Sequence, residues 1–209
     1  MSEEAILKAQ RELRKHVIVQ ETLDLLARDL PDSLWYHALP HTEDVLDEVI
    51  RFGVTDNLSP RDLELLAIAA ACHDVGFVST PTSNESLGAA FAREQMERHG
   101  GFSSDEIALV ERMIMDTALI MNDLGLRQVA TTRLSGYLLD ADLSNLGRED
   151  FFAKGELQRK ELGQDLDLFR KNALALLLAH QWNTSAGRLL RQTRKEHNIQ
   201  LSLALVHSK

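Results

Sequence analysis

Four side chains in this sequence belong to the residue types that bind divalent metal ions. They are His41, the adjacent pair His73 and Asp74, and Asp142. Two imidazoles and two carboxylates suit a divalent transition ion better than calcium, which prefers oxygen ligands alone. The sequence therefore predicts a site for one divalent ion per chain, with manganese, iron, cobalt, nickel or magnesium as the candidates and these four residues as its ligands.

The apolar pattern around the two acids predicts that both point inward. Asp74 continues the three-and-four spacing of Leu66 and Ala70, which places its carboxylate in line with an apolar helix face. An unpaired carboxylate is costly in that position, so something must compensate it. Asp142 is flanked by leucines at comparable spacings, and two inward acids on different helices can share one cation. Taken singly, each acid is equally compatible with a helix cap or a buried, hydrogen-bonded carboxylate.

Asp140 competes with Asp142 for the role of last ligand. The two lie two residues apart and so point to nearly opposite sides of a helix. Asp142 lies beside Leu138 and Leu139, whereas Asp140 neighbours Gly136. We therefore expect Asp142 to be the inward ligand and Asp140 to supply no more than a supporting hydrogen bond.

Three ordered motifs resemble the HD superfamily, in which an early His, a His-Asp pair and a late Asp surround a metal in a helical bundle. The match extends from Tyr36 to Gly147, and the C-terminal stretch from His180 is also similar to small stand-alone bacterial members. The resemblance implies a metal-dependent phosphohydrolase that cleaves a phosphate ester or anhydride, with a small phosphorylated molecule, most plausibly a nucleotide, as substrate. The three motifs read Tyr36-His37-x3-His41-Thr42, Ala71-Cys72-His73-Asp74-Val75-Gly76-Phe77 and Asp140-Ala141-Asp142-Leu143-Ser144-Asn145-Leu146-Gly147.

The same resemblance suggests catalytic roles for His37 and Asp74. In relatives with the Tyr-His-x3-His arrangement, such as cyclic nucleotide phosphodiesterases, the first His donates a proton to the leaving oxygen, which implies that role for His37. An ordinary, partly exposed His near a helix start fits His37 equally well. Asp74 would both bind the metal and receive or orient the proton of the attacking water, whose pKa the metal lowers.

Departures from related patterns narrow this interpretation to a single metal. Di-metal branches of the superfamily carry additional His residues where this chain has Asn84-Glu85 and Thr117-x2-Ile120. Phe77 stands where the bacterial 5′-deoxynucleotidase pattern has a Glu. Two other functions stay open: a non-catalytic regulatory module that binds a metal or nucleotide, and a di-iron oxygenase on the same scaffold.

The elements that must position these residues are predicted to be helices throughout. Apolar residues recur at helical spacing, and no sustained period-two alternation is found. We expect an all-α, single-domain helical bundle over residues 1–209, with the motif-bearing core at about 33–150 and the metal site in the bundle core. The predicted helices run from Glu3 to Leu30 with a possible break, Ser33 to Gly53, Ser59 to Asp74, Glu85 to His99, Ser104 to Ile120, Leu126 to Leu146, Phe151 to Leu162, Asp165 to His180 and Thr184 to His197.

Composition restricts the partners and the location. The 209 residues are 44% apolar and 26% charged, with one cysteine and a net charge of −9. The absence of a basic run argues against a general nucleic-acid surface, and a phosphorylated substrate would be repelled unless a cation reverses the local field. The charged N-terminal stretch lacks a signal-peptide pattern and no apolar run reaches bilayer length, so we expect a cytoplasmic protein without membrane contact. The oligomeric state stays open.

Overall fold

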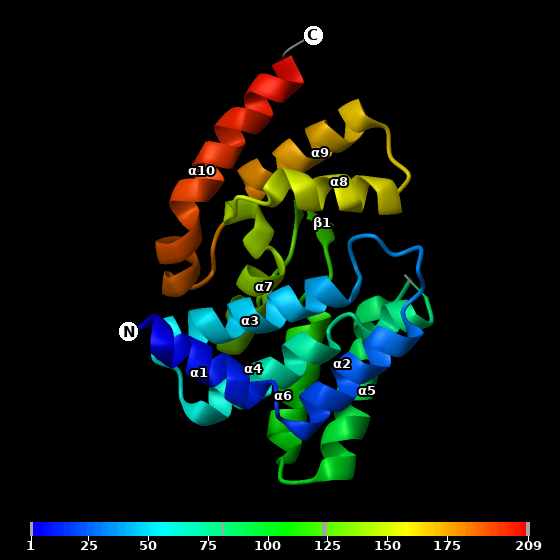
Figure 1. Cartoon of the computed structure of the whole chain (residues 1–209), viewed down its shortest axis with the longest axis vertical. Helices are drawn as coiled ribbons and strands as arrows, with labels where there is room; N and C mark the ends of the chain where they lie inside the picture. The colour runs from blue at the N-terminus through cyan, green and yellow to red at the C-terminus, as the bar shows by residue number, and fades with distance from the viewer. Residues whose placement is uncertain (1, 81, 123–124, 208–209) are drawn as a thin grey trace.

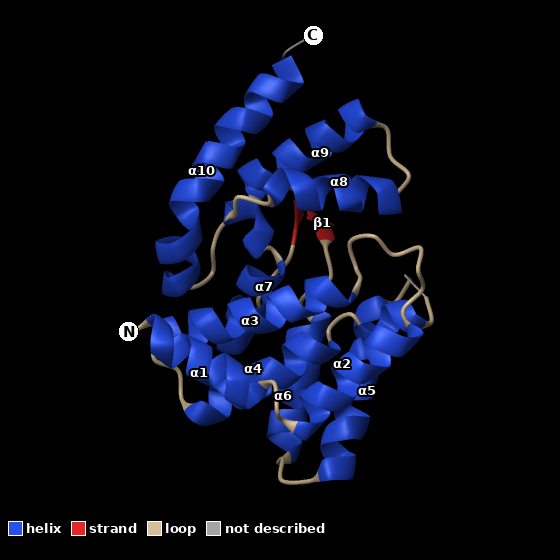
Figure 2. Cartoon of the chain, viewed as in Figure 1, coloured by secondary structure: helices blue, strands red, loops and turns tan. Residues whose placement is uncertain are grey.

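The computed structural model of the chain is almost entirely helical, as Figures 1 and 2 show, which confirms the all-α prediction at the level of class. It describes residues 2–80, 82–122 and 125–207. The elements in chain order are α1 (Glu3–Leu13), α2 (Val17–Asp29), α3 (Leu39–Thr55), α4 (Pro60–Cys72), η1 (Val75–Val78), α5 (Asn84–His99), α6 (Ser104–Met115), β1 (Ile120–Asn122), β2 (Gly125–Arg127), α7 (Arg133–Asp142), η2 (Ser144–Gly147), α8 (Phe151–Glu161), α9 (Leu166–Ala179) and α10 (Ser185–His207).

Several helices begin where short polar side chains can satisfy their free amides. Ser59 accepts a hydrogen bond from the backbone of Asp62, with Pro60 in the first turn, as the sequence predicts. Ser103 and Glu106 form a reciprocal capping box at the start of α6. Asp165 accepts from two backbone amides at the start of α9. Local sequence therefore fixes these starting points.

The helices pack around two apolar clusters. The larger cluster takes buried side chains from α1 through α7, with α3 and α4 packed against each other inside it. The smaller cluster lies among η2, α8, α9 and α10 and contains Leu146, Phe151, Leu177 and Trp182. In Figure 1 helix α3 crosses the middle of the molecule, with α8, α9 and α10 above it and α1, α4 and α6 below. The helix ends that meet near α3 form the site described below.

The predicted segment from Ser33 to Gly53 becomes helical only at Leu39, and it continues to Thr55. Residues 31–38 are irregular because their backbone finds other partners: the amides of Tyr36 and His37 both donate to a carboxylate oxygen of Glu161. Pro40 then lies in the first turn, where its missing amide hydrogen costs nothing. The predicted helix from Ser59 similarly ends early, at Cys72, so that the His73-Asp74 pair lies just beyond it.

A small antiparallel hairpin replaces the predicted helical ends at Ile120 and Leu126. Ile120 pairs with Arg127 and Met121 with Leu126. Strands of three residues are too short to show an alternating pattern, so periodicity does not predict them. Helix α7 correspondingly starts at Arg133 and ends at Asp142, and not at Leu126 and Leu146 as predicted.

The last helix extends to His207, ten residues past the predicted end at His197. Asn198 and Ser202 are polar residues that weaken a helical prediction, yet both are buried. The Asn198 side-chain amide donates to the backbone carbonyls of Leu146 and Arg148, so contacts with η2 and the segment after it hold this turn of α10.

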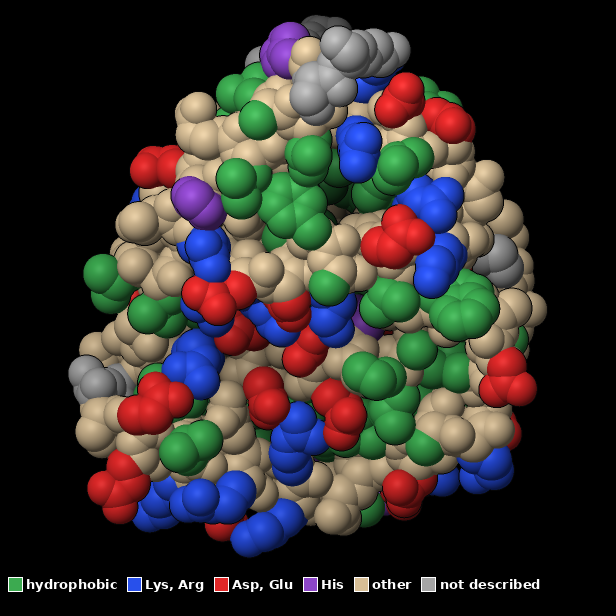
Figure 3. Space-filling view, turned by 45° about the horizontal axis from the view of Figure 1, so that its top comes forward, with side chains coloured by type: hydrophobic (Ala, Val, Ile, Leu, Met, Phe, Trp, Pro, Cys, Tyr) green, Lys and Arg blue, Asp and Glu red, His purple; other side chains and the backbone are tan. Residues whose placement is uncertain are grey.

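The surface is mixed in charge. Acidic and basic side chains lie interspersed across the face in Figure 3, with apolar side chains between them. Within the described residues, none of the helices combines the length and the apolar character needed to cross a bilayer.

Candidate metal centre

The ends of three helices bring three of the predicted ligands together. His41 lies in the first turn of α3, His73 directly follows α4, and Asp142 is the last residue of α7. One donor atom from each lies within 4.8 Å of the other two. In the part of the chain that the structure describes, this is the one group of three or more His, Cys, Asp or Glu side chains close enough to hold a metal ion.

Asp74 joins this group from the side of the two histidines. Its Oδ2 atom lies 3.2 Å from Nε2 of His73 and 3.4 Å from Nε2 of His41. Asp142 approaches the same nitrogens from its Oδ1 atom, at 3.8 Å and 3.2 Å respectively. Asp74 therefore places a donor atom near both Nε2 atoms, but the three residues whose donor atoms all lie within 4.8 Å of one another are His41, His73 and Asp142.

Two of these donor atoms are buried and have no hydrogen-bond partner. They are Nε2 of His73 and Oδ2 of Asp74, in side chains that are 2% and 8% exposed. Leaving such atoms unsatisfied costs free energy comparable to a lost hydrogen bond. Nδ1 of His73 lies 2.7 Å from the carbonyl oxygen of Ala70, to which it can donate, so Nε2 is the nitrogen that an ion would meet once it displaces the proton that the nearby acids favour there. The donor chemistry and the unsatisfied atoms fit a divalent metal.

Electrostatics at the centre also favour a cation. Burial lowers the pKa of His73, but the nearby carboxylates of Asp74 and Asp142 raise it more, to about 9. Burial raises the pKa of Asp74, yet the neighbouring His73, His37 and His41 bring it well below its ordinary value. Asp142 is affected in the same way, with His41 as the main opposing group, and its pKa is lowered. Both acids are therefore ionised at neutral pH.

Two amide side chains hold the carboxylates in place, and the sequence analysis assigned this role to neither. Asn84 donates to Oδ1 of Asp74 at 2.9 Å, and it stands where the compared di-metal pattern has a histidine. Gln128 donates to Oδ2 of Asp142 at 2.6 Å and to the carbonyl of Thr117. The only sequence signal for Asn84 was its place in the compared pattern, and Gln128 had none. Glu85, the residue after Asn84, is half-buried in the first turn of α5.

His37 lies beside the centre and is held on two sides. Its ring stacks on Phe77, with centroids 4.3 Å apart, and its centroid lies 5.7 Å from that of His41. Its Nδ1 atom is hydrogen-bonded to Glu161, a residue 124 positions later that the sequence analysis did not identify. Burial lowers the pKa of His37, but the bond to Glu161 and the charge of Asp74 outweigh it, so the pKa is raised.

Asp140 corrects part of the sequence argument. The pattern predicted that only Asp142 points inward, but Asp140 is fully buried, whereas the Asp142 side chain is 15% exposed. Asp140 accepts four hydrogen bonds, from the backbone amides and side chains of Asn183 and Thr184. The neighbours of Asp140 on α7 indicated an exposed side of the helix. That side is buried because the start of α10 packs against it. Asp140 lies outside the group of donor atoms described above.

The other histidines lie away from the centre. His180 is buried at the end of α9, and His99, His197 and His207 are exposed. No known family model matches the chain, and no curated protein matches its sequence.

Proposed function

We propose that the protein is a metal-dependent phosphohydrolase that cleaves a phosphate ester or anhydride, with a nucleotide as the substrate class. One observation carries this proposal. His41, His73, Asp74 and Asp142 place donor atoms close together, and two of these atoms, in His73 and Asp74, are buried without a hydrogen-bond partner. The order of these residues in the chain agrees with the resemblance to the HD superfamily. The choice of a nucleotide rests on that resemblance alone.

The four residues would hold one divalent ion. When bound, the ion supplies Lewis acidity and positive charge for a phosphoryl group that the net charge of −9 would otherwise repel. Asp74 is suited to orienting the attacking water by a hydrogen bond. Its lowered pKa favours this role over acceptance of the proton, because a weakly basic carboxylate is a poor base.

His37 is suited to protonating the leaving oxygen. Its raised pKa favours the protonated ring near neutral pH, and its contacts with Glu161 and Phe77 hold the ring in one orientation. A general acid oriented by a third group is a recurring catalytic arrangement. Glu161 is accordingly a positioning residue, since it acts through His37.

The first experiment measures metal content. Untagged wild-type protein is expected to hold about one manganese, iron, cobalt, nickel or magnesium ion per chain, and His73→Ala and Asp74→Ala are expected to lose both the ion and hydrolysis of a generic phosphoester. The exposed His197→Ala serves as the control and should behave as wild type. Two irons per chain would support a di-iron oxygenase in its place. Wild-type metal binding by both site variants would refute the ligand assignment.

The second experiment separates His37 from the metal ligands. His37→Ala should keep the ion but slow hydrolysis by about 100-fold or more, the usual scale for a lost general acid. The loss should shrink for a nitrophenyl ester, whose leaving group needs little protonation. Glu161→Gln should shift the limb of the pH–rate profile that reports the His37 pKa toward lower pH. An equal loss with both esters would show that His37 is not the proton donor.

A metal-loaded protein that hydrolyses none of a broad phosphoester panel, yet is thermally stabilised by a nucleotide, would favour a regulatory binding module. That result would separate binding from turnover and replace the proposed activity.

A further inference from the structure

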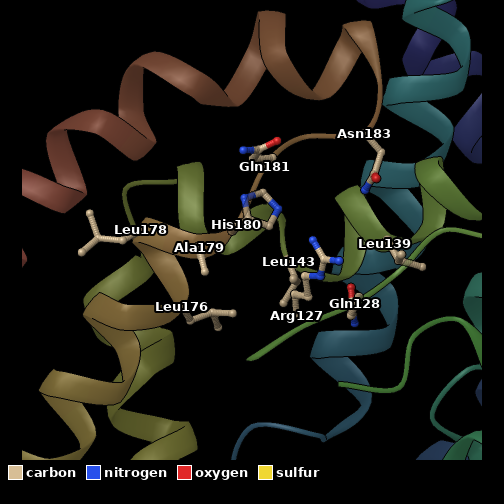
Figure 4. Close-up of a pocket in the computed structure, with 10 residues that line it drawn as sticks. All are labelled: Arg127, Gln128, Leu139, Leu143, Leu176, Leu178, Ala179, His180, Gln181 and Asn183. Atoms are coloured by element: carbon tan, nitrogen blue, oxygen red, sulfur yellow. The ribbon is translucent and has the colours of Figure 1, made fainter. Parts of the chain in front are cut away.

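A cavity of about 390 Å³ lies behind the metal centre, between β2, α7 and the end of α9. Figure 4 shows the side chains around it, with Arg127 and Gln128 near its middle and His180 above them. Its volume falls in the range of small-molecule sites. None of His41, His73, Asp74 and Asp142 lines it, so it is separate from the site proposed for the metal.

Arg127 is the one Lys, Arg, Asp or Glu side chain among the described residues that line the cavity. Its guanidinium stays protonated at any ordinary pH and carries five N–H donors. No carboxylate of the described residues forms an ion pair with it, and its Nε atom is buried without a hydrogen-bond partner. An arginine left in this state has its full charge available for an oxyanion, which it can bind through two parallel hydrogen bonds.

Two further residues of the cavity lining each carry a polar atom that is buried without a partner. The atoms are Nδ1 of His180, in a residue only 8% exposed, and Oε1 of Gln128. Burial lowers the pKa of His180 to about 3, so its ring is neutral and adds no charge of its own. Two segments far apart in the chain, residues 127–128 and His180, thus bring residues that carry an unsatisfied polar atom to the lining of one cavity.

The remaining wall is mixed. Leu139, Leu143 and Leu176 supply apolar surface, from α7, the residue after it and α9, while Gln181 and Asn183 add polar surface. The apolar part of the wall suits the body of an organic molecule, and a bare inorganic ion would leave it facing water.

We propose that this cavity binds a small organic oxyanion, a carboxylate or phosphate carried on an apolar body, with its charged group on Arg127. The proposal does not rest on the hydrolase activity. Gln128 links the two sites physically, because its amide donates to Asp142 and the residue also lines the cavity.

Benzoate and phenylphosphonate are the probes, and they distinguish a carboxylate from a phosphate-type group. Neutral benzamide and inorganic phosphate are the controls, since each lacks one half of the proposed ligand. Binding is followed by NMR at the Arg127 Nε–H signal in the full-length protein. We expect at least one phenyl oxyanion to shift this signal in a saturable way, with clearly weaker effects from benzamide and inorganic phosphate.

Arg127→Gln should weaken binding of that probe about tenfold or more, the scale of a lost charge-assisted hydrogen-bonded pair. Arg112→Gln, on the exposed side of α6, is the matched control and should bind as wild type. His73→Ala should also bind the probe as wild type does. Because this variant lacks a proposed metal ligand, it distinguishes a phosphonate held in the cavity from one held by a metal ion. Ala179→Leu narrows the cavity without touching the guanidinium, and should weaken the phenyl probes more than inorganic phosphate.

The proposal would be overturned if no probe shifted the Arg127 signal up to its solubility limit, since the cavity would then hold water only. Equal binding of benzamide and benzoate would also overturn it, as would unchanged binding by folded Arg127→Gln. If Arg127→Gln does not fold, the wild-type comparison of charged and neutral probes, together with Ala179→Leu, decides the question.

Discussion

Two aspartates of α7, only two residues apart, have different surroundings. Asp142 carries one oxygen toward His41 and the other toward Gln128. Asp140 accepts hydrogen bonds from the backbone amides and side chains of Asn183 and Thr184, at the start of α10. A Cβ atom added at Gly187 would lie 2.4 Å from the Oδ2 atom of Asp140. The first carboxylate is therefore available to an ion, whereas the second is fully occupied by protein donors.

The two asparagine variants should fail in different ways. Asp142→Asn removes a negative charge at the proposed metal site and should raise the metal dissociation constant about tenfold or more, with little change in the unfolding free energy of the metal-free protein. Asp140→Asn replaces one acceptor oxygen by an NH2 donor that faces two donors, and should cost about 1–3 kcal/mol of stability while it leaves metal affinity largely intact. Calorimetric metal titration and chemical denaturation measure the two effects. Loss of the metal by folded Asp140→Asn, with retention by Asp142→Asn, would reverse the assignment.

At the scale of elements, α5 comes unusually close to the end of α4. A Cβ atom at Gly88 would lie 2.6 Å from the carbonyl oxygen of Cys72 and 3.0 Å from that of His73. These neighbours are backbone atoms and cannot rotate away. The glycine thus allows α5 to pack against the residues that present His73 and Asp74, and it also brings Asn84 to Asp74 from the start of the same helix.

Gly88→Ala should therefore destabilise the protein by about 1–3 kcal/mol and displace the His73-Asp74 pair, which should weaken metal binding as well. Gly155→Ala is the matched control inside α8, where the nearest atom to an added Cβ is a Phe169 ring carbon at 3.4 Å. That change should be neutral or stabilise by up to about 1 kcal/mol, because alanine favours a helix interior. Denaturation midpoints of the two variants give the comparison. Equal stability of both would show that α5 can move away from α4 at no cost.

At the scale of the whole molecule, the C-terminal helices are tied to the rest of the chain by buried polar contacts. Arg191 of α10 pairs with Glu48 of α3, and Lys195 of α10 donates to the backbone carbonyl of His180 at the end of α9. The His180 ring lies against Trp182, with centroids 4.4 Å apart. Lys195 and the His180 ring lie beside Trp182 of the smaller apolar cluster, where burial disfavours a charge on that ring.

His180 should make the fold sensitive to acid. Burial first, and then the charge of Lys195, lower its pKa from 6.5 to about 3. Between these values the unfolded chain binds a proton that the folded protein does not, so stability falls as the pH drops below about 6.5, by up to about 1.4 kcal/mol per pH unit. His180→Gln should remove this contribution, whereas His197→Gln, at an exposed position, should keep it. Denaturation curves from about pH 6 to pH 4 measure the slopes, and unchanged slopes in His180→Gln would contradict the argument.

The sequence by itself determined the helical class, several helix starts and the identity of the residues that meet at the candidate metal centre. These features depend on local spacing, since a helical period and a capping residue such as Ser59 act within one or two turns. The His73-Asp74 pair and Asp142 could be predicted as ligands because the apolar residues near Asp74 and Asp142 indicated that both carboxylates point inward.

Only the tertiary structure decided which groups surround that centre. Glu161 reaches His37 across 124 positions, and Gln128 reaches Asp142 from a hairpin whose strands are too short to leave a periodic signal. The burial of Asp140 and the cavity at Arg127 likewise arise where the start of α10 and the end of α9 close against α7 and β2. A hydrogen bond between distant segments fixes no spacing along the chain, so its partners become visible only when the helices are packed.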